Sequence, residues 1–352
     1  MRYLGIRLFV LLPVVFFSVP SWSAQVIEPL KEALELHESG KIKEALVIYD
    51  KFIKTHPKRA EGYFNRGNAY YDLGQNQHAI KDYTEAIRLM PKDGEAYLSR
   101  GNAYRRLKQT QAALADYSAA IKLNPPDARA YINRGSLHFD ARRYDAALED
   151  FSEAIRLVPD DADSYYNRGN SYLALNKKEE AIKDYTEALS LEDKLVDAYY
   201  NRGIAYSDSD QIDAAIADFT AVIKLSPKFS DAYYNRGLAA AKAGKYESAI
   251  EDYSESIRLD PKDAEAPFNR GIAYLRVAKV DYAARDFSEV IRIQPRNAEA
   301  HVYRGIARIY QKREKDADAD FSKAFQLDPT LKKNVQPLIE EAKAQAKAEA
   351  TK

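Results

Sequence analysis

The sequence predicts an all-α repeat protein built from stacked helix-turn-helix units. The dipeptide Arg-Gly returns every 34 residues, eight times in succession and without an insertion or deletion. An alanine follows each of these glycines after 12 positions, and an aromatic residue follows after 16. Self-similarity at this period indicates a solenoid in which each unit is a pair of antiparallel helices that buries its apolar face only by stacking on its neighbours.

Each position of the unit has a physical reason. When the glycine is counted as position 8, nine units begin at Val26, Ala60, Gly94, Ala128, Ala162, Val196, Ser230, Ala264 and Ala298. The first unit is degenerate, because it lacks Arg-Gly but keeps Gly40, Ala45 and Tyr49. Glycine at position 8 and alanine at position 20 let two helices approach closely. The aromatic residue at position 24 starts the apolar stripe of the second helix.

The helix ends are also marked. Proline stands at position 32 in eight units and ends the second helix, and Asp193 is the exception. Aspartates then precede the next first helix as expected N-caps, at Asp93, Asp127, Asp161 and Asp263. Because Asp193 replaces the proline, we expect the weakest junction of the array between Ser190 and Asp197.

Arginine at position 7 and aspartate at position 23 occur together in the same eight units. The degenerate first unit has neither, with Glu32 and Ile48 in their places. A hairpin turn near position 15 brings positions 7 and 23 opposite each other. The pattern therefore predicts a ladder of salt bridges inside the solenoid, and the alternative is that the arginines bind a ligand.

The termini differ from the repeats. Residues 1–23 have the form of a secretory signal peptide, with Arg2 and Arg7 before the apolar run Leu8 to Val19, and small residues favour cleavage before Ala24. Twelve apolar residues are too few to cross a bilayer core, which needs about 20; an uncleaved anchor is the alternative. The repeats fill residues 24–331. Residues 332–352 are expected to form a capping helix with a frayed tail, whose apolar residues are Val335, Leu338, Ile339, Ala342 and Ala346.

Composition argues against several function classes. Lys+Arg and Asp+Glu both number 53, so the chain has no net basic surface for nucleic acid. It contains no cysteine, and its five histidines fall at unrelated repeat positions. Asp208 and Asp210 lack the glycine and the final carboxylate of a calcium loop. We expect no enzyme, catalytic residue, metal or cofactor, since no nucleophile stands beside a base and no glycine-rich phosphate loop is present.

Glycine at position 8, tyrosine at position 11, alanine at position 20 and proline at position 32 resemble the tetratricopeptide repeat family. The resemblance covers Val26 to about Leu331. It implies a right-handed superhelix in which the first helices line a concave groove and the second helices form the convex back. It also implies that positions 2, 5, 6, 9, 12 and 13 face the groove.

Asparagines gather at groove positions 6 and 9, and tyrosines at position 5. The candidate ligand residues are Asn65, Asn68, Asn102, Asn133, Asn167, Asn170, Asn201, Asn235, Asn269, Tyr166, Tyr200 and Tyr234. Asparagine weakens a helix interior, so its recurrence needs a reason. Amides can bond an extended peptide backbone without reading its side chains, and tyrosine adds rigid contact area. The alternative is that the pattern is a relic of duplication. Position 9 turns apolar from Ile204 onwards.

A basic cluster, Arg105, Arg106 and Arg129, interrupts an otherwise acidic row at position 2. It would suit an acidic segment or a C-terminal carboxylate, and a solvated charge group is the alternative.

The expected function is an exported, periplasmic scaffold whose groove binds extended segments of other proteins, in envelope assembly, secretion or polymer export. Neither nucleic acid nor membrane insertion after signal cleavage is expected. The alternatives are a self-assembling rod and an accessory carbohydrate-binding protein of an export complex.

Overall fold

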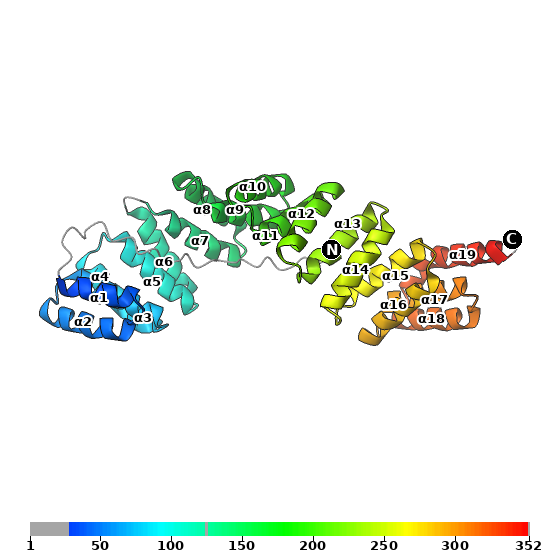
Figure 1. The fold of residues 1–352 in the computed structure, drawn as a ribbon, viewed down its shortest axis with the longest axis horizontal. Coiled ribbons are helices and arrows are strands. Elements are labelled where there is room, and N and C mark those ends of the chain that lie inside the picture. Colours follow the sequence, from blue (N-terminus) through cyan, green and yellow to red (C-terminus); the bar gives the residue numbers. More distant parts are fainter. Residues whose placement is uncertain (1–27, 124–125, 351–352) are drawn as a thin grey trace. The chain divides into compact units, whose positions relative to one another are not determined.

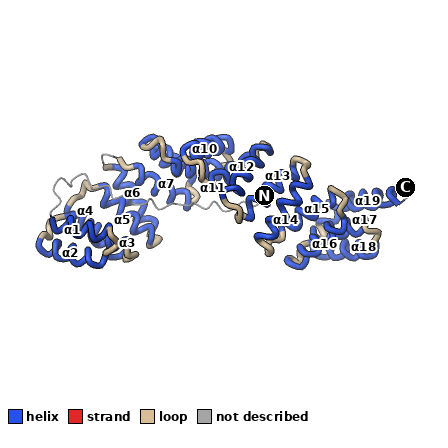
Figure 2. Tube along the Cα trace, in the orientation of Figure 1, coloured by secondary structure: helices blue, strands red, loops and turns tan. Residues whose placement is uncertain are grey.

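The computed structural model describes residues 28–123 and 126–350 of the chain. The predicted signal peptide, residues 1–23, lies outside them. The elements in these ranges are nineteen α-helices, with no strand among them (Figure 1, Figure 2). The chain separates into two compact units, one ending at Leu191 and the other starting at Glu192, which we call the N-terminal and C-terminal units. The boundary lies inside the segment Ser190 to Asp197.

The helices follow the predicted two per repeat. The N-terminal unit contains α1 (Glu28–Glu38), α2 (Ile42–Thr55), α3 (Ala60–Asp72), α4 (Asn76–Leu89), α5 (Gly94–Arg106), α6 (Thr110–Lys122), α7 (Ala128–Asp140), α8 (Tyr144–Leu157), α9 (Ala162–Ala174) and α10 (Lys178–Leu191). The C-terminal unit contains α11 (Val196–Asp208), α12 (Ile212–Leu225), α13 (Ser230–Lys242), α14 (Tyr246–Leu259), α15 (Glu265–Arg276), α16 (Val280–Ile293), α17 (Ala298–Tyr310), α18 (Glu314–Leu327) and α19 (Leu331–Ala350).

The helices of each unit form two layers. Each odd-numbered helix packs against the even-numbered helix that follows it, and that even helix packs on the next odd helix. Successive odd helices also touch, as α3 and α5 do in one unit and α13 and α15 in the other. Successive even helices make no comparable contact in the described ranges. We call the solvent side of the odd layer the odd-helix face and that of the even layer the even-helix face.

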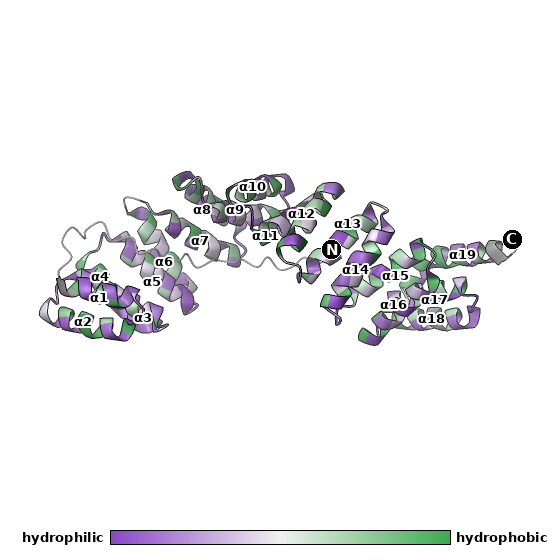
Figure 3. Ribbon diagram, viewed as in Figure 1, coloured by the Kyte–Doolittle hydropathy of each residue, from purple (hydrophilic) through white to green (hydrophobic). Residues whose placement is uncertain are grey.

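The glycine at position 8 is required by the aromatic ring at position 24. A Cβ atom on Gly169 would lie 2.9 Å from a ring carbon of Tyr185, and one on Gly101 would lie 2.6 Å from the ring of Tyr117. The alanine at position 20 is completely buried in every unit, as Ala181 illustrates. Apolar and polar residues accordingly alternate around the helices (Figure 3). The predicted close approach of the two helices is confirmed.

Three of the four predicted N-caps are confirmed. The carboxylates of Asp93, Asp127 and Asp161 each accept a hydrogen bond from a backbone N–H two or three residues later. Asp263 stands one residue before Ala264, the N-cap of α15, but its carboxylate also accepts from the N–H groups of Glu265 and Ala266. These bonds satisfy donors that the first turn of a helix leaves open.

Helix α19 packs on α17 and α18 at the end of the array. Ile339 and Ala342 are buried in a cluster with Val302 and Phe321. Leu338, on the same helix, is 38% exposed.

Candidate functional site

Each arginine of the predicted ladder donates two parallel hydrogen bonds to the aspartate of its own unit. In Arg168, Nε donates to Oδ2 of Asp184 and Nη2 donates to Oδ1, both at 2.8 Å. The same paired geometry occurs in Arg66–Asp82, Arg100–Asp116, Arg134–Asp150, Arg202–Asp218, Arg236–Asp252, Arg270–Asp286 and Arg304–Asp320. The aspartates are buried, so the predicted ladder is confirmed as an internal structure.

The ladder also joins neighbouring repeats, which the sequence did not suggest. Nη1 of Arg168 donates to the hydroxyl of Ser152, which lies on the even helix of the preceding unit, at 3.3 Å. Arg100 reaches Thr84 in the same way at 3.1 Å. The hydrogen bonds to Asp184 raise the pKa of Arg168. Because carboxylate and hydroxyl oxygens take up these guanidinium donors, the geometry favours the structural role over a ligand role.

The asparagines at position 9 have a partner inside the fold. The tyrosine hydroxyl at position 24 donates to the amide oxygen in three units, from Tyr83 to Asn68 at 2.7 Å, from Tyr117 to Asn102 at 2.9 Å, and from Tyr185 to Asn170 at 2.7 Å. Burial raises the pKa of Tyr83 well above its ordinary value, so this hydroxyl keeps the proton that it donates.

The identity of position 9 follows that of position 24. Where position 24 is phenylalanine and has no hydroxyl, position 9 is Ser136, Ile204, Ile272 or Ile306. Two tyrosines depart from this rule, since Tyr49 and Tyr253 face Leu34 and Leu238 in the sequence pattern. The switch from asparagine to apolar residues at position 9 was visible in the sequence, and comparing it with position 24 would have indicated the structural role.

The asparagines at position 6 lie between successive odd helices. Nδ2 of Asn235 donates to the hydroxyl of Tyr200 at 2.8 Å, and Asn269 bonds the hydroxyl of Tyr234 at 3.1 Å. Nδ2 of Asn133 donates to Oδ1 of Asn102 at 3.1 Å. These amides therefore link one repeat to the next.

The tyrosines at position 5 are not the exposed contact area that we expected. Tyr166, Tyr200 and Tyr234 are 5%, 3% and 3% exposed. Their rings turn inwards against the aromatic residue at position 24 of the same unit, with 6.0 Å between the ring centres of Tyr166 and Tyr185. Close packing of the hairpin leaves room for this ring only in the interior. A ligand role for the tyrosines stays untested, but the rings offer little surface.

Some amide groups remain available on the odd-helix face of the N-terminal unit. Asn65, Asn68 and Asn102 are half-buried, whereas Asn167 and Asn170 are buried. Among the described residues, the Nδ2 groups of Asn68 and Asn102 donate no hydrogen bond. The side chain of Asn65 also makes no hydrogen bond to another described residue. In the C-terminal unit, Asn201 and Asn269 are half-buried. The three N-terminal amides retain donors that a bound chain could use.

The basic cluster is largely compensated within the fold. Arg129 pairs with Glu95 and Asp127. The guanidinium of Arg106 lies 3.5 Å from the ring centre of Tyr71 and donates to the carbonyl oxygen of the same residue. Arg105 reaches Oδ1 of Asn133 at 3.3 Å. Binding of an acidic ligand here stays a prediction, and it would have to compete with these contacts.

Comparison with known families identifies the architecture. A model described as "TPR repeat" matches residues 33–74, 67–108 and 101–141, and a second, described as "Tetratricopeptide repeat", matches residues 132–199 and 200–264. The chain belongs to the tetratricopeptide repeat family. None of the curated proteins matches it.

Several solved structures are similar to this chain. A tetratricopeptide repeat protein from Parabacteroides merdae is 21% identical, with a TM-score of 0.50 over 73% of this chain and 98% of that one. YrrB, described as a TPR protein with an unusual peptide-binding site, is 26% identical, with a TM-score of 0.48 over 52% of this chain and 94% of that one. MamA from Desulfovibrio magneticus RS-1 is 24% identical, with a TM-score of 0.46 over 48% and 96%.

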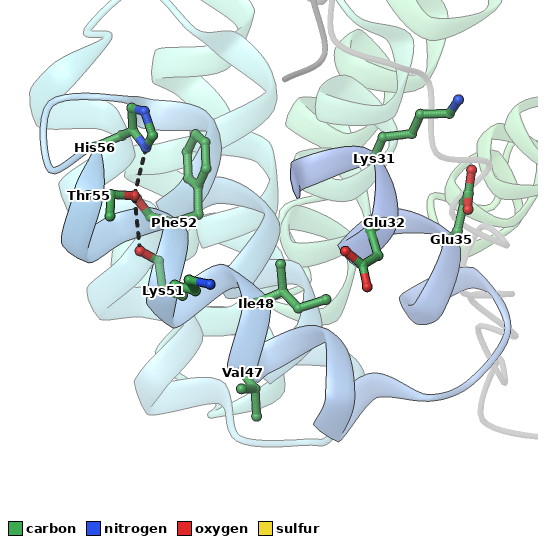
Figure 4. A pocket seen from close by; sticks show the side chains of 9 residues that line it. All are labelled: Lys31, Glu32, Glu35, Val47, Ile48, Lys51, Phe52, Thr55 and His56. Atoms are coloured by element: carbon green, nitrogen blue, oxygen red, sulfur yellow. Dashed lines mark hydrogen bonds between the residues drawn. The ribbon is translucent and has the colours of Figure 1, made fainter. Parts of the chain in front are cut away.

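A surface pocket of about 680 Å³ lies on the first tetratricopeptide repeat, between α1 and α2 (Figure 4). Helix α1 contributes Lys31, Glu32 and Glu35, and α2 contributes Ile48 and Phe52 among its lining residues. Glu32 and Ile48 occupy the positions that hold the arginine and aspartate of the ladder elsewhere. The pocket therefore lies where the ladder stops.

In the part of the chain that the structure describes, no helix has the length and apolar character needed to span a membrane. No group of three or more histidine or carboxylate side chains is placed there to hold a metal ion.

Proposed function

We propose that this protein is an exported tetratricopeptide repeat scaffold whose odd-helix face binds extended segments of other proteins. The observation that carries the proposal is the set of unused amide donors at Asn65, Asn68 and Asn102, of which two lie on α3 and one on the next odd helix, α5. Amide donors suit the carbonyl oxygens of an extended backbone. Family membership supports a scaffold, and the sequence pattern of residues 1–23 supports export.

The two alternatives receive less support. In a rod, another molecule would stack on the first repeat and bury Glu32 and Glu35, which are exposed and would lose their hydration. Other units carry arginine and mostly alanine at these two positions. A carbohydrate site would need exposed aromatic rings, but Tyr166, Tyr200 and Tyr234 are buried.

Site-specific photo-crosslinking in the native cell tests the proposal. A photoreactive residue replaces Asp140 or Arg276, which are exposed at position 13 of α7 and α15. The matched controls are Glu149 and Glu251, which are exposed at position 22 of α8 and α14. We expect protein adducts from the odd helices and none from the even helices. Adducts from the two even-helix sites alone would overturn the proposal.

A further inference from the structure

The odd-helix face changes chemistry between the two units. In the second to fifth repeats, position 9 holds Asn68, Asn102, Ser136 and Asn170, whereas the C-terminal unit has Ile204, Leu238, Ile272 and Ile306. Leu238 and Ile272 are half-buried on α13 and α15. At position 12 of the same helices, Ala241 and Leu275 are also half-buried. We call these four side chains, together with Tyr303 on α17, the apolar strip. Leu238 and Ala241 pack on one buried cluster, and Ile272, Leu275 and Tyr303 pack on another.

Internal packing explains Ile272, which is matched to Phe287, but it does not explain Leu238. In three repeats a tyrosine at position 24 faces an asparagine that accepts its hydrogen bond, and Tyr49 in the first repeat faces Leu34. Tyr253 is almost fully buried and faces Leu238 instead, so among the described residues its hydroxyl has no such acceptor. Giving up a buried hydrogen bond costs stability. A half-buried position, such as that of Leu238, where the residue departs from the pairing seen in other repeats is typical of a functional surface.

Charged side chains lie on both sides of the apolar strip. Position 2 is acidic in every repeat of the C-terminal unit, and Glu265 and Glu299 are exposed there. On the opposite edge, Lys242 already pairs with Asp210 at 2.7 Å. The exposed carboxylates on two neighbouring odd helices are therefore complementary to a ligand with basic side chains.

We propose that the odd-helix face of the C-terminal unit binds an extended segment whose apolar side chains recur every third residue, with lysine or arginine between them. The proposal rests on the proposed function and names the class of partner. Packed helices are about 8–10 Å apart. A polyproline II segment advances about 9 Å in one turn of three residues, so residues i, i+3 and i+6 meet successive odd helices from one side. The intervening basic residues reach Glu265 and Glu299.

Defined peptides test the spacing and the charge. Fluorescence anisotropy measures binding of the full mature chain to a peptide with leucine at i, i+3 and i+6 and lysine between. The comparison peptides have the same composition with leucine at i, i+2 and i+4, or glutamate in place of lysine. We expect each comparison peptide to bind at least about tenfold more weakly. Equal affinity for all three would overturn the proposal.

Two substitutions taken from the chain's own repeats test the strip. Leu238→Asn recreates the asparagine–tyrosine pair with Tyr253, and Ile272→Ser recreates the pairing of Ser136 with Phe151, so both variants should fold. We expect the double variant to keep its helicity and to lose at least about tenfold in peptide affinity. Glu265→Gln with Glu299→Gln should remove most of the salt dependence of binding. A folded double variant with unchanged affinity would overturn the proposal.

The peptide-binding test and the crosslinking test can fail independently of each other. If Asp140 and Arg276 yield crosslinks while the apolar peptide fails to bind, only the inference about the segment is wrong. If neither site yields an adduct, the proposed function itself fails.

Discussion

The side chain at position 9 of each repeat is matched to the presence or absence of a hydroxyl at position 24. Asn68 accepts from Tyr83, and Ile272 stands where Phe287 has nothing to donate. The match is an internal constraint, which explains why the amide oxygens of Asn68, Asn102 and Asn170 already have a partner inside the fold.

This match predicts a compensating pair of substitutions. Asn68→Leu alone leaves the Tyr83 hydroxyl buried without an acceptor and should cost about 1–3 kcal/mol. Adding Tyr83→Phe removes that hydroxyl and should recover most of the loss, because other repeats already combine phenylalanine with an aliphatic residue. Urea unfolding of the four members of the cycle measures the coupling; additive effects would contradict the structural role.

The ladder predicts a second coupling. Arg168→Ala leaves the buried carboxylate of Asp184 without its two charged donors and should cost roughly 1–3 kcal/mol. Asp184→Ala should cost a similar amount, and the double variant clearly less than the sum. The same urea titration decides between coupling and independence. Independent effects would show that the paired hydrogen bonds contribute nothing to stability.

At the scale of the helix pair, the turn between the two helices requires a left-handed backbone conformation. Position 15 adopts a left-handed backbone in every repeat, with glycine at Gly40, Gly74 and Gly244 and other residues elsewhere. Ala278 has φ 57°. Only glycine takes this conformation without a steric penalty.

The turn predicts a stabilising substitution. Ala278→Gly should raise stability by about 1 kcal/mol, since the left-handed conformation costs alanine about 1–2 kcal/mol. The reverse change, Gly74→Ala at φ 73°, is the matched control and should lower stability. Thermal unfolding followed by circular dichroism compares the two. A decrease for Ala278→Gly would show that the turn does not require glycine.

The pairing of elements was predictable because the alanine of the close approach, the ion pair and the proline that ends the second helix each repeat eight or nine times in phase. What the sequence could not provide was the direction of side chains between repeats. Family geometry assigned position 5 to the groove, yet the ring of Tyr200 packs inwards against Phe219. The bond from Arg168 to Ser152 also depends on a neighbouring repeat, so no pattern within one unit reveals it.

At the scale of the whole molecule, the proposed export determines the compartment in which partners would be met. The basic start and short apolar run of residues 1–23 predict that the mature protein begins at Ala24 or Gln25. Mass spectrometry of the N-terminal peptide, from protein recovered from the cell envelope, measures this directly. An intact Met1 would leave only the uncleaved anchor.

The central claim is that partners bind the odd-helix face. Carboxylate footprinting of the full mature chain, with and without the partner that the crosslinks capture, tests it most directly. Asp140 and Glu265 are exposed on odd helices, and Glu149 and Glu251 are exposed on even helices. We predict that the partner protects the carboxylates on the odd helices from labelling and leaves the even-helix pair unchanged. Protection confined to Glu149 and Glu251 would contradict the account.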